Sequence, residues 1–307
     1  IDGGAPITVA LNGSAQATLL TSTLGAATHT IVVNYLGDAS FTASSGSLAG
    51  GQVVSKANTT TSVSSSLNPS TFGQTVTFTA TIAAVAPGVG TPTGSVQFVI
   101  DGGAPTPAFL NGAGQATFAT SNLTAGTHTV TVDYLGGANF AISTGILAGG
   151  QVVNPSASAT AVASSANPSA FGQTVTFTAT VTAVAPGIGT PTGNVQFVID
   201  GAAPVSAALN GAAQAVLTTA ALTGGTHTVV VNYLGDANFI NSSGALTGGQ
   251  VVNQAATALV VSSIAPNPSV FGDPTTTYTV LLTATTGDAS VIGPTGTVTF
   301  LANGAPF

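Results

Sequence analysis

The strongest constraint on the fold is an internal repeat with a period of 99 residues. The segment at residues 68–81 returns from residue 167 almost letter for letter, and a looser version opens at Asn267. Tyr35, Tyr134 and Tyr233 keep the same step. This period exceeds that of solenoid repeats, which is about 20–50 residues. Each copy is therefore expected to be a domain with its own core, in a tandem array.

The phase of the repeat divides the chain into four parts. Residues 1–54 match the C-terminal half of a domain, 55–153 and 154–252 are full domains, and 253–307 match the N-terminal half. The last part diverges, with extra residues around 286–292. The halves have two interpretations: an arbitrary window of a longer repeat protein, or half-domains completed by the next unit, along one chain or by strand exchange between subunits.

The boundaries fall near residues 54–57, 153–157 and 252–255, after a Gly-Gln-Val-Val motif. Linkers of a few residues are too short to behave as free coil. The sequence therefore predicts a fairly stiff rod of domains.

Alternating side chains predict β-strands within each copy. In residues 75–82, Val76, Phe78 and Ala80 share one face with Ile82, and threonines occupy the other. Further strands are predicted around 96–100 and 115–120, and His128 shares one parity of a long strand with Val130, Val132 and Tyr134. Asp-Gly and Asn-Gly pairs between these runs indicate hairpins. We count about seven strands per copy and no helical period, a pattern typical of an all-β, Ig-like antiparallel β-sandwich.

Charged residues form only 3% of the chain, and the net charge is −7 with a single cation, Lys56. Ordinary soluble domains contain about 25% charged residues. Nucleic acids and anionic membranes are recognised through Lys and Arg, so neither is expected as a partner.

Cysteine is absent, and no apolar run is long enough to span a bilayer, so no membrane insertion is expected in this segment. Met is absent too, and no signal-peptide pattern occurs. These features predict an internal piece of a longer or processed protein.

No catalytic, cofactor-binding or metal-binding residue is predicted. His29, His128 and His227 occur once per copy on an inward parity, which favours structural histidines over ligands, because a metal site needs several converging ligands. Ser, His and Asp occur in each copy without a nucleophile elbow, so no catalytic triad is expected. The remaining candidates for chemistry are five aspartates, which we interpret as turn residues, with interdomain calcium as the alternative: Asp2, Asp38, Asp101, Asp200 and Asp236.

The sequence does not favour a phosphate-binding loop, isopeptide cross-links or a sugar-binding site. The Gly-rich loop at 87–94 lacks the Lys of a phosphate cradle. Lys56 is the only amine side chain, so Lys–Asn isopeptide cross-links are not available to most copies. With no Trp and inward tyrosines, lectin activity is not expected. Glycosylation is left open by four Asn-x-Ser/Thr sequons, at Asn12, Asn58, Asn122 and Asn241.

Three motifs resemble the bacterial Ig-like repeat domains of large surface and adhesin-type proteins. They are the Asn-Pro-Ser-Thr-Phe-Gly-Gln segment at 68–74, the strand at 92–98, and the Gly-Thr-His-Thr-Val run at 126–137, where Gly137 replaces the aspartate of the neighbouring copies. The resemblance covers essentially the whole chain. It implies a secreted spacer, stalk or adhesive segment without naming a ligand.

The sequence therefore predicts a non-enzymatic extracellular protein of the cell surface, a repeat unit of a filament, stalk or adhesin shaft. The alternative is a module that binds a host or surface ligand through its inter-strand loops. The predicted partners are further copies of the chain or neighbouring repeats, because a sheet edge poor in Lys and a surface poor in charge favour association into a filament or bundle.

Overall fold

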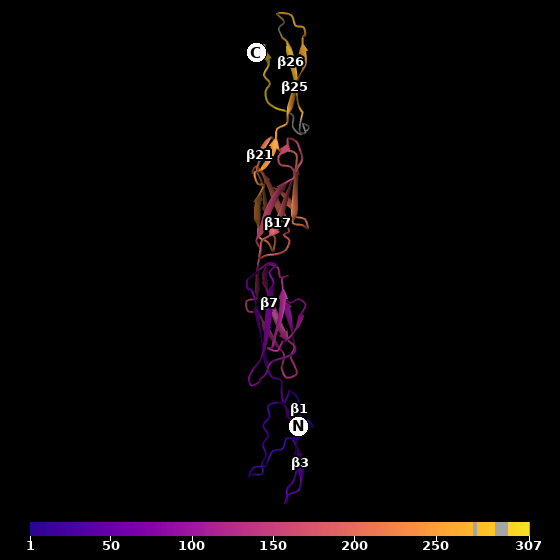
Figure 1. Cartoon of the computed structure of the whole chain (residues 1–307), viewed down its shortest axis with the longest axis vertical. Coiled ribbons are helices and arrows are strands. Elements are labelled where there is room, and N and C mark those ends of the chain that lie inside the picture. The colour runs from indigo at the N-terminus through magenta and orange to yellow at the C-terminus, as the bar shows by residue number, and fades with distance from the viewer. Residues whose placement is uncertain (273–274, 286–293, 307) are drawn as a thin grey trace. The chain divides into compact units, whose positions relative to one another are not determined.

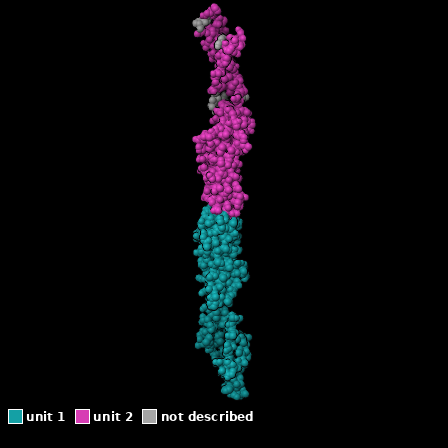
Figure 2. Space-filling view, turned by 90° about the vertical axis from the view of Figure 1, so that its left-hand side faces the viewer, with its two compact units in different colours: residues 1–70, 75–153 teal, residues 71–74, 154–307 magenta. Residues whose placement is uncertain are grey.

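The computed structural model describes residues 1–272, 275–285 and 294–306, and these contain strands, turns and loops without a helix (Figure 1). The extra residues expected around 286–292 lie outside the described residues. By its internal contacts the chain forms two compact units, residues 1–70 with 75–153 and residues 71–74 with 154–307 (Figure 2). Each unit holds one full copy of the repeat and one half-copy. We call residues 1–54 the N-terminal half-copy and 253–307 the C-terminal half-copy.

The first full copy contains ten strand segments. They are β5 (Thr59–Ser65), β6 (Ser70–Thr71), β7 (Val76–Ala84), β8 (Ser95–Ile100), β9 (Thr106–Phe109), β10 (Gln115–Thr120), β11 (Gly126–His128), β12 (Val130–Tyr134), β13 (Ser143–Ile146) and β14 (Gln151–Asn154).

The second full copy repeats them. Its segments are β15 (Ser158–Ser164), β16 (Ser169–Ala170), β17 (Val175–Ala183), β18 (Asn194–Ile199), β19 (Val205–Ala208), β20 (Gln214–Thr219), β21 (Gly225–His227), β22 (Val229–Tyr233), β23 (Ser242–Ala245) and β24 (Gln250–Asn253).

In both copies the strands form an Ig-like sandwich. One sheet of the first copy has the order β10-β7-β5 and the facing sheet the order β13-β12-β8-β9, while β11, β14 and β6 form a small third sheet. Three chain segments are each interrupted once, giving the consecutive pairs β5/β6, β11/β12 and β13/β14. Counting each pair as one strand gives the predicted seven, and the all-β Ig-like fold is confirmed.

The core consists of the inward residues that the alternation predicted. Val76, Phe78, Ala80 and Ile82 on β7 are at most 2% exposed, and they pack with Val96, Phe98, Val130, Val132 and Tyr134 from the facing sheet. The second copy has an equivalent cluster around Phe177, Phe197 and Tyr233. The single long strand expected around His128 is instead two strands, because β11 pairs with β14 whereas β12 pairs with β8 and β13.

The half-copies contain short, isolated ladders. The N-terminal half-copy has β1 (Thr28–His29) paired with β4 (Gln52–Val53) and β2 (Val32–Tyr35) paired with β3 (Ser44–Ser47). The C-terminal half-copy has β25 (Thr257–Ala265) paired with β26 (Thr277–Ala284) and β27 (Leu301–Ala302) paired with β28 (Ala305–Pro306). Neither contributes to the buried apolar clusters found in the described part of the chain.

Candidate functional site

In both full copies and in the N-terminal half-copy, a histidine forms a hydrogen bond with the aspartate of the Asp-Gly turn. In the first full copy, His128 Nδ1 lies 2.6 Å from Asp101 Oδ2, and the second ring nitrogen lies 2.8 Å from the Thr124 carbonyl oxygen. The other carboxylate oxygen of Asp101 accepts the Thr129 amide at 2.8 Å. The same contacts recur around two further pairs, His227 with Asp200 and His29 with Asp2.

Both ring nitrogens of these histidines face acceptors, an arrangement that only the doubly protonated imidazolium satisfies by donating twice. The Thr223 carbonyl and then Asp200 raise the pKa of His227 above its ordinary value. At His128, burial opposes protonation, but the bonds to Asp101 and Thr124 outweigh it and raise the pKa. Conversely, the hydrogen bond from His227 lowers the pKa of the Asp200 carboxyl. Each pair is therefore an ion pair at pH values between the folded-state pKa of the aspartate and that of the histidine.

The pair fixes the β8–β9 turn to the break between β11 and β12. His128 and His227 are buried, in agreement with their inward parity, and the aspartates accept backbone amides at the turns. The pairing itself was missed, because the two residue types were interpreted separately. A signal was present: Asp and His are 27 residues apart in all three occurrences.

A second polar cluster surrounds a glutamine that is completely buried. Gln151 Nε2 lies 2.9 Å from the Leu67 carbonyl and 3.2 Å from Ser70 Oγ, and its Oε1 accepts the Ser65 hydroxyl at 2.6 Å. Gln250 has matching partners in the second copy. The side-chain amide thus provides hydrogen bonds to main-chain and hydroxyl groups where β5 ends and β6 begins. A buried apolar side chain could not form these bonds.

The two sheets meet closely along the edge formed by β5 and β13. Thr59 and Thr61 both bond the Ser143 hydroxyl at 2.7 Å. Beside them, a Cβ added to Gly145 would collide with the Thr61 carbonyl, so only glycine fits. This contact covers one edge of each sheet without charged side chains, and β15 and β23 repeat it through Thr160 and Gly244.

One loop differs between the copies where Gly137 replaces aspartate. In the second copy, Asp236 accepts the amides of Asn238, Phe239 and Thr192 at 2.8–2.9 Å, and also the Thr192 hydroxyl. In the N-terminal half-copy, Asp38 likewise accepts two backbone amides, those of Ser40 and Phe41. In the first copy, Lys56 donates to the Gly137 carbonyl at 2.8 Å. The only Lys or Arg of the chain thus bonds the loop in which glycine replaces the aspartate.

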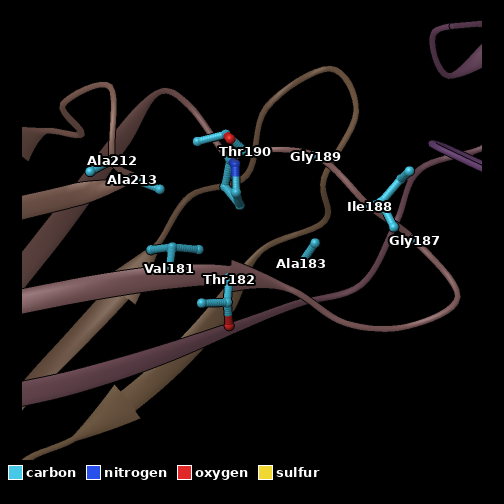
Figure 3. Close-up of a pocket in the computed structure, with 10 residues that line it drawn as sticks. Val181, Thr182, Ala183, Gly187, Ile188, Gly189, Thr190, Ala212 and Ala213 are labelled. Carbon is cyan, nitrogen blue, oxygen red and sulfur yellow. The ribbon is translucent and has the colours of Figure 1, made fainter.

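One hollow of the described surface lies beside β17. This hollow of about 400 Å³ is lined by small apolar and hydroxyl side chains, including Val181, Thr182 and Ile188, and none of its lining residues is titratable (Figure 3). Among residues 1–272, 275–285 and 294–306, no three His, Asp, Cys or Glu side chains gather as a metal site would require. The four sequons are exposed, and their glycosylation stays a prediction.

The described residues contain no helix of the length and apolar character needed to cross a membrane. No curated protein matches the chain. Among solved structures, it is similar to the Yersinia pseudotuberculosis adhesin InvE, with 16% identity, a TM-score of 0.33, and coverage of 67% of this chain and 66% of that one. It is also similar to the mouse nectin-like molecule 4 ectodomain, with 12% identity, a TM-score of 0.26, and coverage of 62% and 63%. The chain thus spans slightly less than two thirds of either protein.

The sequence model of one family matches residues 60–154 and again residues 155–252. These two matches coincide with the two full copies that the repeat and the cores define, and together they cover more than half of the chain. The chain therefore belongs to the bacterial Ig-like domain (group 3) family.

Proposed function

We propose that the chain is a non-enzymatic structural segment of an extracellular bacterial surface protein, serving as the shaft of a filament, stalk or adhesin. The observation that carries this proposal is that both full copies contain the same apolar core, the same Asp–His pair, the same buried glutamine and the same contact between two sheet edges. Repetition of structural devices, without a cluster of chemical groups that is unique to one copy, is what a spacer needs.

The loops favour a shaft over a ligand-binding module. Asn111 and Asn210 shape equivalent turns, each accepting two backbone amides at 2.9 and 3.0 Å. Binding loops usually differ between copies and present aromatic or Arg side chains. Here the loops repeat, and the chain contains no Trp and only one Lys or Arg.

Mechanical extension of the 307-residue chain by atomic force microscopy tests the shaft role. Two full copies of similar structure are expected to unfold as two separate events, each releasing about 30 nm of contour length for 99 residues. The same protein is screened for binding to glycans and extracellular-matrix proteins. Saturable binding that is lost on substitution of an inter-strand loop would favour the ligand-binding module instead.

A cellular experiment tests the location. Brief treatment of intact source cells with a protease of broad specificity is expected to release peptides from residues 55–252. Release of these peptides only after lysis contradicts a surface location.

A further inference from the structure

One turn of the first full copy belongs by its contacts to the second unit. Residues 71–74 lie within the copy at 55–153, yet they group with residues 154–307. The Phe72 amide donates to the Asn154 carbonyl at 2.8 Å, where the second full copy begins. The Phe-Gly turn, as we call residues 71–74, is therefore a part of the second unit that the preceding copy supplies.

The Phe-Gly turn is held in shape by its own hydrogen bonds. The Gln74 amide donates to the Thr71 carbonyl at 2.9 Å, and the Thr71 amide donates to Gln74 Oε1 at 2.7 Å. Gly73, at the third position of this β-turn, has a φ of +85°, a conformation that favours glycine. The ring of Phe72 is therefore presented by a turn with a defined backbone.

The ring of Phe72 packs on the apolar core of the second full copy. It meets the Phe239 ring edge to face, with 5.4 Å between the ring centroids and an interplanar angle of 80°. Phe239 is 2% exposed and belongs to the core cluster, against which Phe72 is partly buried. An edge-to-face aromatic pair stabilises beyond the area that it buries. Phe72 thus extends the core of the second copy with a side chain from the first.

The loop at residues 187–189, labelled in Figure 3, is shaped to receive the Phe-Gly turn. A Cβ on Gly73 would lie 2.6 Å from the Ile188 carbonyl oxygen and 2.8 Å from the Ile188 amide nitrogen, so the two main chains approach closely. From the other side, a Cβ on Gly189 would lie 3.0 Å from the Phe72 ring. Glycine on both sides therefore permits this contact, and a larger residue on either side would push the turn away from the loop.

We propose that the Phe-Gly turn couples the stabilities of consecutive copies, with the surface formed by residues 187–189 and Phe239 as its receptor. The preceding copy supplies Phe72 to the core of the following one, so the folding of one copy favours the folding of the next. Tandem repeats with interfaces of this kind behave as a chain of nearest-neighbour interactions. This inference goes beyond the shaft role, because independent domains on short linkers would also form a shaft.

The residues of this contact recur with the repeat. The Phe-Gly pair returns at 171–172 and 271–272, and the Gly-Ile-Gly loop has its counterpart in Gly-Val-Gly at 88–90. This is the Gly-rich loop whose sequence did not favour phosphate binding. The coupling is therefore expected wherever two copies of this repeat follow each other.

Hydrogen exchange of the 307-residue chain, read by mass spectrometry, tests this inference. Phe72→Ala should accelerate exchange of the β17 and β22 amides by at least about tenfold, because the second copy opens more often without the ring. The β7 and β12 amides of the first copy, to which residue 72 belongs by sequence, should accelerate less. Phe109→Ala is the matched control and should leave both copies unchanged, since Phe109 is 85% exposed and Ala208 is its equivalent.

A second variant tests the contact between the two rings. Phe239→Leu keeps an apolar side chain in the core of the second copy but removes the ring that Phe72 meets. Residues in contact show non-additive effects. In the Phe239→Leu chain, Phe72→Ala should therefore accelerate the β17 and β22 amides by a factor at least about three times smaller than in the native chain.

Three results overturn the inference: unchanged exchange of the second copy in Phe72→Ala, an equal or larger acceleration in the first copy, or the same acceleration with and without Phe239→Leu. An equal or larger effect in the first copy would make Phe72 a structural residue of its own copy. None of these results bears on the shaft role, which the extension and surface-exposure experiments test separately.

Discussion

At the scale of single residues, the paired Asp and His link the stability of each copy to pH. The folded-state pKa of His128 and His227 is raised, so their contribution is fully present below the unfolded value of about 6.5 and is lost as pH rises through the folded value. The pKa of Asp101 and Asp200 is lowered, so their contribution is present above about 3.9 and is lost as pH falls through the folded value.

We therefore expect the melting temperature of the chain to be highest between about pH 4 and 6.5 and to fall toward pH 8. Replacing both residues, in a His128→Gln, His227→Gln chain, should remove most of this fall. It should also cost roughly 1 kcal/mol per copy at pH 6, a modest value because the carboxylates are half exposed. Calorimetry from pH 3 to 9 measures both effects. A fall above pH 6.5 of equal size in the double variant would show that other groups cause it.

The buried glutamines make a second residue-scale prediction. Gln151→Leu removes the amide that accepts the Ser65 hydroxyl and donates to the Leu67 carbonyl and to the hydroxyl of the buried Ser70. We expect a loss of about 2–3 kcal/mol in the first full copy, the usual cost of unsatisfied buried polar groups. Hydrogen exchange of the β14 amides, read by mass spectrometry, reports this loss locally.

Gln52→Leu is the matched control, because Gln52 is exposed and its side-chain amide bonds the Val53 carbonyl. In dilute solution this substitution should change the free energy of unfolding by less than about 0.5 kcal/mol. Equal effects of the two substitutions would mean that the buried amide network adds nothing to stability.

At the scale of elements, the contact of β5 with β13 depends on a glycine. Gly145→Ala places a methyl group against the Thr61 carbonyl, and we expect the first full copy to lose about 2–3 kcal/mol as the two edges separate. Gly46 is the equivalent glycine of the N-terminal half-copy and has no heavy atom within 4 Å of an added Cβ, so Gly46→Ala should be nearly neutral. Urea unfolding of both variants measures the difference. Similar midpoints for both would contradict the close approach.

A loop element gives a further prediction. Asp236→Gly converts the second copy to the residue found at Gly137 and removes the acceptor of four hydrogen bonds, without the substitute that Lys56 provides. The expected cost is about 1–3 kcal/mol in the second copy alone. The reciprocal Lys56→Ala should weaken the first copy by no more than about 1 kcal/mol, since the ammonium is exposed. Hydrogen exchange of the loops at 234–240 and 135–141 distinguishes the two copies.

Strand prediction from the sequence succeeded where a segment and its partner are both present. The alternation of residues 75–82 predicted β7, and the repeat then placed β17. The same reasoning cannot distinguish residues 16–21 from β10, because the two segments are closely similar in sequence. Residues 115–120 form a strand because β7 pairs with them, whereas residues 16–21 have no such partner in the described part of the chain and form no strand. Pairing, not local sequence, decides here.

The Asp–His pairs show the same limit for the site. Parity predicted that the histidines point inward, and the Asp-Gly pairs predicted turns. Neither pattern predicts that the aspartate of the turn after β8 contacts the histidine that ends β11. That contact depends on the pairing of β8 with β12 in the sheet. The constant spacing of 27 residues between Asp101 and His128, and between the equivalent residues, was the accessible clue.

At the scale of the whole molecule, the two full copies and the two half-copies should differ in protection from solvent. Amides of residues 115–120 and 214–219 lie in sheets and are expected to exchange at least about a thousandfold more slowly than in a free peptide, as for local opening that costs about 4 kcal/mol. In a dilute sample, amides of residues 16–21 should exchange within about tenfold of the free-peptide rate, because no ladder holds them.

The full copies provide the internal reference, because their amides are measured in the same sample. Exchange at 16–21 as slow as at 115–120 would contradict this prediction and would mean that the half-copy is ordered without the ladder that β7 provides in the full copy.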